Sequence, residues 1–428
     1  MRDALLERFQ AVRGATEALA APLSPEDQQL QSMPSASPTK WHRAHTTWFF
    51  ETFVLAARGI APVDARWGLL FNSYYEAAGP RHPRPRRGIL SRPSCQEIAA
   101  YRRAVDGRML ELIGCADDRA LGELRPVVEL GLAHEEQHQE LLLTDILSAF
   151  ADSPLRPAYR AALPAALTGA RREPGAAADP VRWHEHPGGV TELGAPSGRE
   201  TFVFDNETPR HRVFLEPFAL ASRLVTVGEW KAFRAAGGYA TPSLWLSDGW
   251  DRVRTAGIDA PAYARLEGGA LVVFGVDGER EACDDEPLAH VDYYEADALA
   301  RFLGARLPTE AEWEAHARRA APERGNFRED GALRPLAAAA AATRDAPAQL
   351  FGDVWEWTGS SYEAYPGYAP AAGALGEYNG KFMVGQRVLR GGSCFSPRGH
   401  VRATYRNFWH PDTRLQVTGL RLARSVKP

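Results

Sequence analysis

The first 150 residues carry apolar side chains at helical spacing. The i, i+3, i+4, i+7 pattern runs through residues 4–20, 41–57, 96–115 and 121–150. The second of these segments follows Ser37-Pro38-Thr39, which is typical of a helix start. A stretch rich in Gly, Pro and Arg over 79–93 interrupts the pattern and is not helical throughout. Four helices of this length predict a helical bundle over residues 1–150.

The pattern changes twice after the bundle. Residues 151–180 are rich in Ala, Pro and Arg without a regular apolar period, and they predict a linker. From residue 181 onward, short apolar runs alternate with Gly-rich turns, which indicates an α+β domain over 181–428. Within it we expect helices and strands at these positions: helices at 294–303 and 309–318, and strands at 212–215, 386–390, 401–405 and 419–423.

Composition narrows the class of protein. The chain has 428 residues, of which 45% are hydrophobic and 24% charged, with a net charge of −4. These values are ordinary for a globular enzyme and argue against nucleic acid or a membrane surface as a partner. No segment resembles a signal peptide or reaches the ~18 apolar residues of a membrane span, so we expect a cytoplasmic location. The four cysteines form no C-x-x-C pair, which argues against a cysteine zinc site and a disulfide framework.

The sharpest chemical feature is a pair of histidines in the last helix of the bundle. His134 and His138 stand at i and i+4 and therefore project from one face of the helix. His45, on the second helix, is the expected third ligand of a metal ion. Three histidines leave coordination positions open, which suits Fe(II) binding O₂ together with a substrate atom. His42 stands three residues earlier, and we expect it behind the ligands or at the surface.

The same five residues also match H-E-x-x-H, the zinc-protease helix. In that interpretation Glu135 is the general base, and the chain is a zinc-dependent hydrolase or thiol transferase. No third ligand follows at the spacing of the extended protease motif, which disfavours this interpretation. Spacing alone does not separate iron from zinc.

Longer motifs carry a family resemblance. SPTKWHRAHTTWFFE at 37–51 and HEEQHQE at 134–140 resemble the DinB-like domain of the ergothioneine-pathway sulfoxide synthases. LPTEAEWE at 307–314, GDVWEWT at 352–358 and LRGGSC at 389–394 resemble the second domain of these enzymes, which has the fold of the formylglycine-generating enzyme and C-type lectins. The motifs occur in the family order along almost the whole chain. The resemblance therefore implies an α+β protein with a DinB-like four-helix bundle followed by a lectin-like domain.

The resemblance also implies roles for individual residues. His45, His134 and His138 would bind Fe(II), and Gln137 would hydrogen-bond the imidazole of the substrate. Tyr74 and Tyr75, in NSYY at 72–75, match the branch of the family with two tyrosines near the iron, one of which would donate a proton. Two further groups have expected substrate contacts: Asn407, Phe408 and Trp409 would hold the betaine end, and Arg84 and Arg87 would bind a carboxylate of the second substrate.

The implied reaction uses O₂ to join a thiol or selenol donor to the imidazole C2 of hercynine, the trimethylated histidine. The family's usual donor is cysteine or γ-glutamylcysteine. Positions that depart from the usual pattern, Val227, Val384-Gly385 and Trp409, leave open a second branch that makes selenoneine from a selenosugar. In that branch the indole of Trp409 would stack on the sugar ring.

Overall fold

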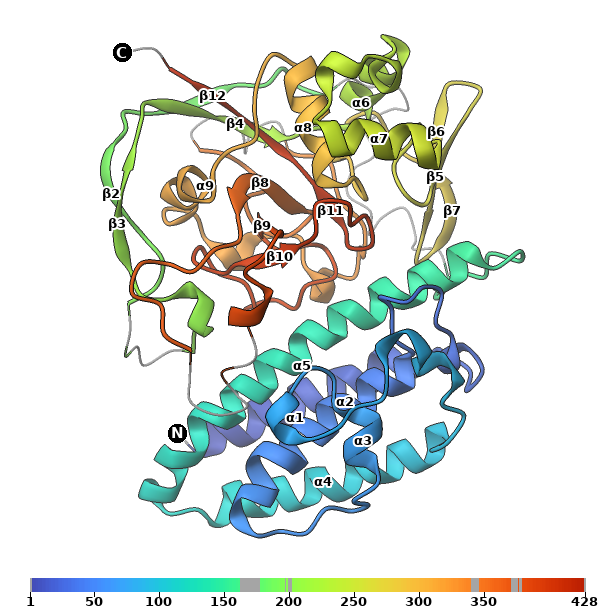
Figure 1. The fold of residues 1–428 in the computed structure, drawn as a ribbon, viewed down its shortest axis with the longest axis vertical. Helices are drawn as coiled ribbons and strands as arrows, with labels where there is room; N and C mark the ends of the chain where they lie inside the picture. The colour runs from blue at the N-terminus through green and yellow to red at the C-terminus, as the bar shows by residue number, and fades with distance from the viewer. Residues whose placement is uncertain are drawn as a thin grey trace. The chain divides into compact units, whose positions relative to one another are not determined.

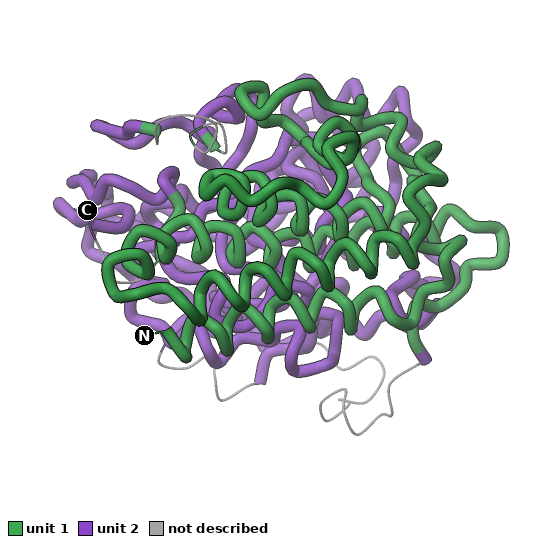
Figure 2. Tube along the Cα trace, turned by 90° about the horizontal axis from the view of Figure 1, so that it is seen from below, with its two compact units in different colours: residues 1–160, 200–204, 370–379 green, residues 161–199, 205–369, 380–428 purple. Residues whose placement is uncertain are grey.

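The computed structural model describes residues 2–161, 178–196, 198, 202–339, 346–370, 376 and 379–426. The chain divides into two compact units, coloured separately in Figure 2. Met1–Arg160 forms most of the first, which we call the helical unit, together with Glu200–Phe204 and Pro370–Asn379. The remaining residues form the second, mixed unit. Most of the predicted linker, residues 162–177, lies outside the described residues.

The helical unit is built on the four long helices labelled in Figure 1. Its helices are α1 (Arg2–Ala20), α2 (Thr39–Phe50), the short α3 (Trp67–Phe71), α4 (Cys95–Cys115) and α5 (Asp118–Asp152). The predicted helical ranges are confirmed to within a few residues, with one difference. The helix expected to reach residue 57 changes at Phe50 into a π-helical segment, Glu51–Leu55, followed by a 3₁₀ turn, Ala56–Arg58.

Local sequence explains where α4 and α5 begin. The Ser94 side chain accepts a hydrogen bond from the backbone N–H of Glu97, and the Glu97 carboxylate accepts one from the backbone N–H of Ser94, which completes a capping box. Asp117 caps α5 in the same way by accepting from the N–H of Ala120. The loop before α4 contains only 3₁₀ turns, at Glu76–Ala78 and Arg84–Ile89, as its Gly and Pro content predicts.

A glycine allows α2 and α5 to approach closely. A Cβ atom built on Gly131 would lie 2.6 Å from Cε1 of Phe50 and 2.9 Å from Cε1 of Phe49, closer than carbon atoms can pack. Both rings are fully buried. Gly131 lies one turn before His134 on α5, so this close packing also brings the histidine-bearing faces of α2 and α5 together.

Within its described residues, the mixed unit contains four small sheets and four α-helices. One sheet has the strand order β1-β4-β12, a second β10-β9-β8-β11, a third β5-β6-β7, and the fourth is the hairpin β2-β3. The strands are β1 (Trp183–His186), β2 (Gly189–Leu193), β3 (His211–Leu215), β4 (Phe218–Leu224), β5 (Ala264–Glu267), β6 (Ala270–Gly275), β7 (Gly278–Glu281), β8 (Trp355–Ser361), β9 (Arg387–Arg390), β10 (Asn407–Trp409), β11 (Thr418–Gly419) and β12 (Arg421–Ser425). The helices are α6 (Val227–Ala235), α7 (Ser247–Ala256), α8 (Tyr293–Phe302) and α9 (Glu310–Ala317). The expected α+β class is confirmed.

One predicted strand, at 401–405, is wrong. This segment forms turns, and two of its carbonyl oxygens accept hydrogen bonds from a side chain in place of a neighbouring strand's backbone. Nη1 of Arg390 donates to the carbonyl oxygens of Ala403 and Tyr405 at 2.9 and 3.1 Å. A buried guanidinium thus replaces the neighbouring strand that the apolar pattern had suggested. The predicted strand at 419–423 is divided between β11 and β12.

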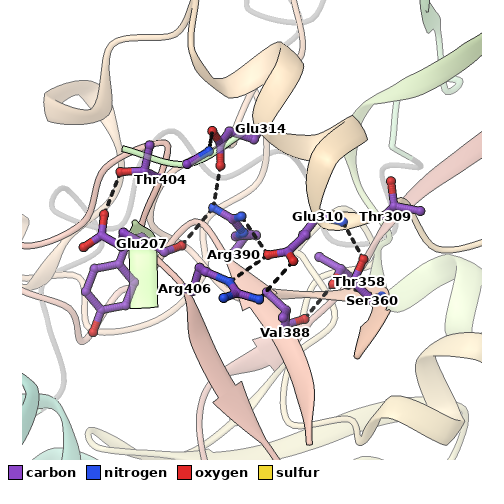
Figure 3. A network of polar contacts seen from close by, with 12 residues as sticks. Glu207, Thr309, Glu310, Glu314, Thr358, Ser360, Val388, Arg390, Thr404 and Arg406 are labelled. Atoms are coloured by element: carbon purple, nitrogen blue, oxygen red, sulfur yellow. Dashed lines mark hydrogen bonds and ion pairs between the residues drawn. The ribbon is translucent and has the colours of Figure 1, made fainter. Parts of the chain in front are cut away.

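A buried network of charges joins α9, β9 and the segment before β10 (Figure 3). The carboxylate of Glu310 accepts from Nη2 of Arg390 at 2.8 Å and from Nε and Nη2 of Arg406, both at 3.0 Å. Both arginines are almost completely buried. Arg406 directly precedes Asn407, so this network fixes the start of β10.

Candidate metal centre and substrate-contacting residues

The structure brings the three predicted ligand residues together. Each of His45, His134 and His138 offers a ring nitrogen, and these nitrogens lie within 4.8 Å of one another. Nε2 of His45 and Nε2 of His134 are 3.2 Å apart. Among the described residues, no other group of three or more His, Cys, Asp or Glu side chains has this geometry. The trio combines one ligand from α2 with two from successive turns of α5.

Protonation also favours metal binding. Burial and the neighbouring imidazoles lower the pKa of His45 and His138 well below 6.5, and burial lowers the pKa of His134 to about 3. At neutral pH the three rings are therefore uncharged and keep a lone pair for a metal. The Nδ1–H of His45 donates to the carbonyl oxygen of Phe71, the last residue of α3, at 2.6 Å. That bond leaves the Nε2 lone pair of His45 directed at the other histidines.

Aromatic rings enclose two of the three histidines. The imidazole of His45 lies between two indoles, with ring centroids 4.5 Å from Trp41 and 5.7 Å from Trp48, and both pairs are nearly parallel. The ring of Phe49 lies 5.0 Å from that of His134. These contacts fix the ring orientations and limit access of water to this side of the trio.

Glu135 is fully buried and engaged away from the imidazole ring nitrogens. Its carboxylate accepts from Arg13 at 2.8 Å, from the hydroxyl of Thr16 at 2.6 Å and from Arg102 at 2.8 Å. Burial opposes ionisation of Glu135, but the positive charges of Arg13 and Arg102 outweigh it and lower its pKa from 4.5 to about 2. A carboxylate held this way is a poor proton acceptor. The geometry therefore argues against the H-E-x-x-H protease interpretation and makes Glu135 a structural residue.

Tyr75 lies in the aromatic cluster beside the trio, whereas Tyr74 is half-buried. The ring of Tyr75 is fully buried, 5.8 Å from Trp48 and 4.7 Å from the ring of Tyr74. Asn72 holds this turn because its amide donates to the carbonyl oxygen of Tyr75 and its carbonyl accepts from the Tyr75 N–H. The ring of Tyr75 thus packs against Trp48 and Phe49, whose rings contact His45 and His134.

Arg84 and Arg87 share a 3₁₀ turn but have different surroundings. Arg84 is exposed, whereas Arg87 is buried, with its guanidinium 3.4 Å from the centre of the Trp41 ring. Arg87 donates to the hydroxyls of Ser37 at 2.9 Å and Ser73 at 3.0 Å. Burial and the charge of Arg84 lower the pKa of Arg87, although an arginine keeps its proton at neutral pH. Among the described residues no carboxylate lies within ion-pair distance of either guanidinium, and the negative charge of Asp145 acts on both from farther away.

The remaining predicted contacts lie on α5 and β10. Gln137 is half-buried between the two ligand histidines of α5. On β10, Asn407 and Trp409 share one acceptor, because Oε1 of Gln416 accepts from Nδ2 of Asn407 at 2.8 Å and from Nε1 of Trp409 at 2.6 Å. Phe408 points elsewhere and stacks on Tyr362 with ring centroids 4.0 Å apart.

Sequence analysis did not identify Gln416 or Asp145 as parts of these groups. Gln416 is buried and lacks the aromatic neighbours that the family usually has around this Gln, and Asp145 accepts a bond from His42 at 3.0 Å. Gln416 contacts residues of β10, and Asp145 contacts His42, which is about 100 residues away in the sequence. A search for short spacings does not detect such contacts. His42 is buried behind the trio, which is one of the two positions expected for it.

Two protein-family models match this chain. Residues 8–142 match the DinB superfamily, and residues 185–348 and 347–426 match the sulfatase-modifying factor enzyme 1-like domain. The chain is 34% identical over 421 residues to the hercynine oxygenase of Mycolicibacterium thermoresistibile, covering 92% of this chain and 88% of the relative. It is also 34% identical over 415 residues to the hercynine oxygenase of Mycobacterium tuberculosis, covering 92% of each chain.

Similarity to formylglycine-generating enzymes is shorter. The enzyme of Streptomyces coelicolor is 33% identical over 163 residues, which is 35% of this chain and 52% of that one. The two hercynine oxygenases, in contrast, match over most of both chains. The chain belongs to the hercynine oxygenase family, and it is an enzyme of the oxidoreductase class. Among the described residues no helix is long and apolar enough to cross a membrane.

Proposed function

We propose that this protein is a non-haem Fe(II), O₂-dependent enzyme that forms a carbon–sulfur bond at the imidazole C2 of hercynine. The observation that carries the proposal is the trio of neutral imidazoles on α2 and α5 in a chain similar to hercynine oxygenases over most of its length. Three nitrogen ligands suit Fe(II), and they leave coordination positions for O₂ and substrate atoms. When bound, the iron would supply the activation of O₂ at this site.

The protein's own residues supply binding and proton delivery in this proposal. Gln137, between the two ligands of α5, orients the hercynine imidazole through a hydrogen bond. Asn407 and Trp409 hold the betaine end, because an indole face binds a trimethylammonium group well. Tyr74 or Tyr75 delivers a proton, a role that places one hydroxyl of the pair at the reacting atoms.

The donor in this proposal is cysteine or γ-glutamylcysteine, bound through its carboxylate. Arg84 and Arg87 support this choice because neither has a carboxylate partner among the described residues. Arg87 has only neutral hydroxyl partners and is buried, so an incoming carboxylate would gain a strong charge-assisted hydrogen bond.

A selenosugar donor is the second candidate, and Trp409 is the departure that favours it most directly. Val227 is buried in the first turn of α6, where an apolar side chain serves the core. Val384 is exposed to solvent. Trp409 is half-buried and its indole N–H is fixed by Gln416, which suits a stacking platform for a sugar. The selenium branch therefore depends on Trp409.

One competition assay separates the donors. The enzyme would be loaded with Fe(II) and supplied with hercynine, O₂, cysteine, γ-glutamylcysteine and a selenosugar together, and the products identified by mass spectrometry. The proposal expects a carbon–sulfur product and loss of turnover in Arg87→Ala, with a mild effect in Trp409→Phe. Formation of only the selenium product, with Trp409→Phe more damaging than Arg87→Ala, would support the second candidate instead.

The metal itself is tested by metal analysis and O₂ consumption. Purified protein should bind one Fe(II) and consume O₂ only when hercynine is present. His138→Ala removes one of the three nitrogens and should abolish both properties while the fold persists. Hercynine-dependent turnover that persists in His138→Ala would contradict the assignment.

A further inference from the structure

Behind the three ligand histidines, a buried fourth histidine connects one ligand to a carboxylate. Nδ1 of His42 lies 2.8 Å from Nδ1 of His138, and Nε2 of His42 lies 3.0 Å from Oδ2 of Asp145. His42 and Asp145 are 2% and 6% exposed, so water does not compete strongly for these bonds. Oδ2 of Asp145 also accepts from the backbone N–H of Ser37 at 2.7 Å, which fixes the carboxylate in place.

The carboxylate of Asp145 determines the direction of both hydrogen bonds made by His42. An ionised aspartate only accepts, so Nε2 of His42 carries the proton. A neutral His42 then has its lone pair on Nδ1, and Nδ1 of His138 must be the donor. His138 is thereby left with its lone pair on Nε2. The opposite direction would place the proton on Nε2 of His138 and leave no lone pair for a metal.

We propose that Asp145 and His42 are positioning residues that hold His138 in the tautomer that binds the metal through Nε2. The inference rests on the proposed metal site and deepens it. The tautomer of His45 is fixed in a similar way, but by a neutral acceptor, the carbonyl oxygen of Phe71. The relay to His138 differs because it ends in a negative charge, which makes the His138 imidazole a stronger electron donor.

An alternative is that His42 and Asp145 only bridge α2 and α5 as a buried polar pair. The two possibilities differ in which nitrogen of His42 matters. A purely structural bridge depends on the Nε2 contact with Asp145. The relay depends on the Nδ1 contact with His138 as well.

Two amide substitutions, each of which reproduces one ring nitrogen of His42, separate these contacts. In His42→Asn the amide oxygen lies near the former Nδ1 position and still accepts from His138, but the link to Asp145 is lost. In His42→Gln the amide nitrogen lies near the former Nε2 position and still donates to Asp145, but the acceptor for His138 is lost. Asp145→Asn keeps the volume and removes the charge.

The experiment measures Co(II) affinity and the visible spectrum of the Co(II) complex, with thermal unfolding of the metal-free protein as a check on folding. Partners that orient a ligand contribute about 10- to 100-fold to metal affinity. His42→Gln should lose about this much, Asp145→Asn should lose less, and His42→Asn should bind Co(II) more tightly than His42→Gln. Thr144→Val, beside Asp145 and buried on the same helix, is the matched control and should bind like the unmodified protein.

The outcomes also separate this inference from the proposed function. If His42→Gln binds Co(II) as tightly as the unmodified protein, or more tightly than His42→Asn, the relay is wrong and the structural bridge is supported. His138→Ala tests the centre itself and should lose Co(II) binding. Retention of Co(II) affinity in His138→Ala would overturn the metal site, whereas its loss together with unaffected His42 variants would overturn only the relay.

Discussion

Replacing Glu135 by Gln separates the two interpretations of the HEEQH segment more sharply than any change to the histidines. The substitution keeps the shape of the side chain but places an amide NH₂ where a carboxylate oxygen now accepts from a guanidinium. Arg13 and Arg102, both almost completely buried, would lose their shared anionic partner. If Glu135 is structural, stability falls and the metal site survives in the folded protein.

The size of the effect follows from the buried charges. Removing one partner from a buried ion pair costs about 3–5 kcal/mol. The pKa of Glu135 gives a similar value, because its depression from 4.5 to about 2 corresponds to about 3 kcal/mol of stability. Since the folded-state pKa is the lower one, this stabilisation is complete above the unfolded pKa of 4.5 and is lost as the pH falls toward 2. Other bonds to the arginines, such as that from Arg13 to Asp106 at 2.7 Å, place the expected loss near the lower end of the range.

The assay is urea unfolding at neutral pH and at pH values down to the acid transition. Glu135→Gln should lose about 3 kcal/mol at neutral pH, and the difference from the unmodified protein should shrink as the pH falls below 4.5. Glu123→Gln, which breaks an exposed i, i+4 pair with Arg119 on the same helix, should cost less than about 0.5 kcal/mol. An unchanged stability together with loss of a hydrolytic activity would refute the reasoning and restore the protease interpretation.

Three further changes test other parts of the structure. Tyr75→Phe and Tyr74→Phe each remove one hydroxyl with little change in volume, so in the variant that lacks the proton donor hercynine binding measured by calorimetry should persist while product formation falls about 10²- to 10⁴-fold; unchanged product formation in both variants would mean that both rings serve packing alone. Gln416→Leu removes the acceptor shared by two donors on β10, so the KM for hercynine should rise while Fe(II) binding measured by metal analysis stays constant. Glu310→Gln leaves the buried guanidinium of Arg406 without a carboxylate and that of Arg390 with Glu314 alone, and it should cost about 3–5 kcal/mol in urea unfolding; a loss below about 1 kcal/mol would show that the remaining acceptors suffice.

Local periodicity was enough to predict most of the helical unit. The apolar spacing of the four long helices extends over many turns, and the i, i+4 pair of His134 and His138 requires only that α5 is a helix. The position of His45 opposite that pair depends on packing between α2 and α5, which the sequence signals only through the presence of Gly131 where two Phe rings approach.

Features that depend on contacts between residues distant in sequence could not be predicted from the sequence. The segment 401–405 has a strand-like pattern, yet it forms no strand, and the side chain of Arg390 on β9 donates to two of its carbonyl oxygens. The burial of Glu135 against Arg13 and Arg102 could not be inferred from H-E-x-x-H. The motif does not specify which neighbouring helices pack against the Glu. Gln416 joins two residues of β10 by contacts that no spacing rule describes.

The two indoles on either side of His45 give the protein an internal optical reporter. Trp41 and Trp48 are 2% and 3% exposed, and both indoles stack on His45, a ligand of the proposed metal. Only the imidazole of His45 therefore separates each indole from the metal site. An open-shell ion at the trio would quench the fluorescence of these two rings through their contact with His45. The other tryptophans, which bring the total to 11, would give a constant background. Metal loading could therefore be followed in real time by the protein's own emission, without a dye or a label.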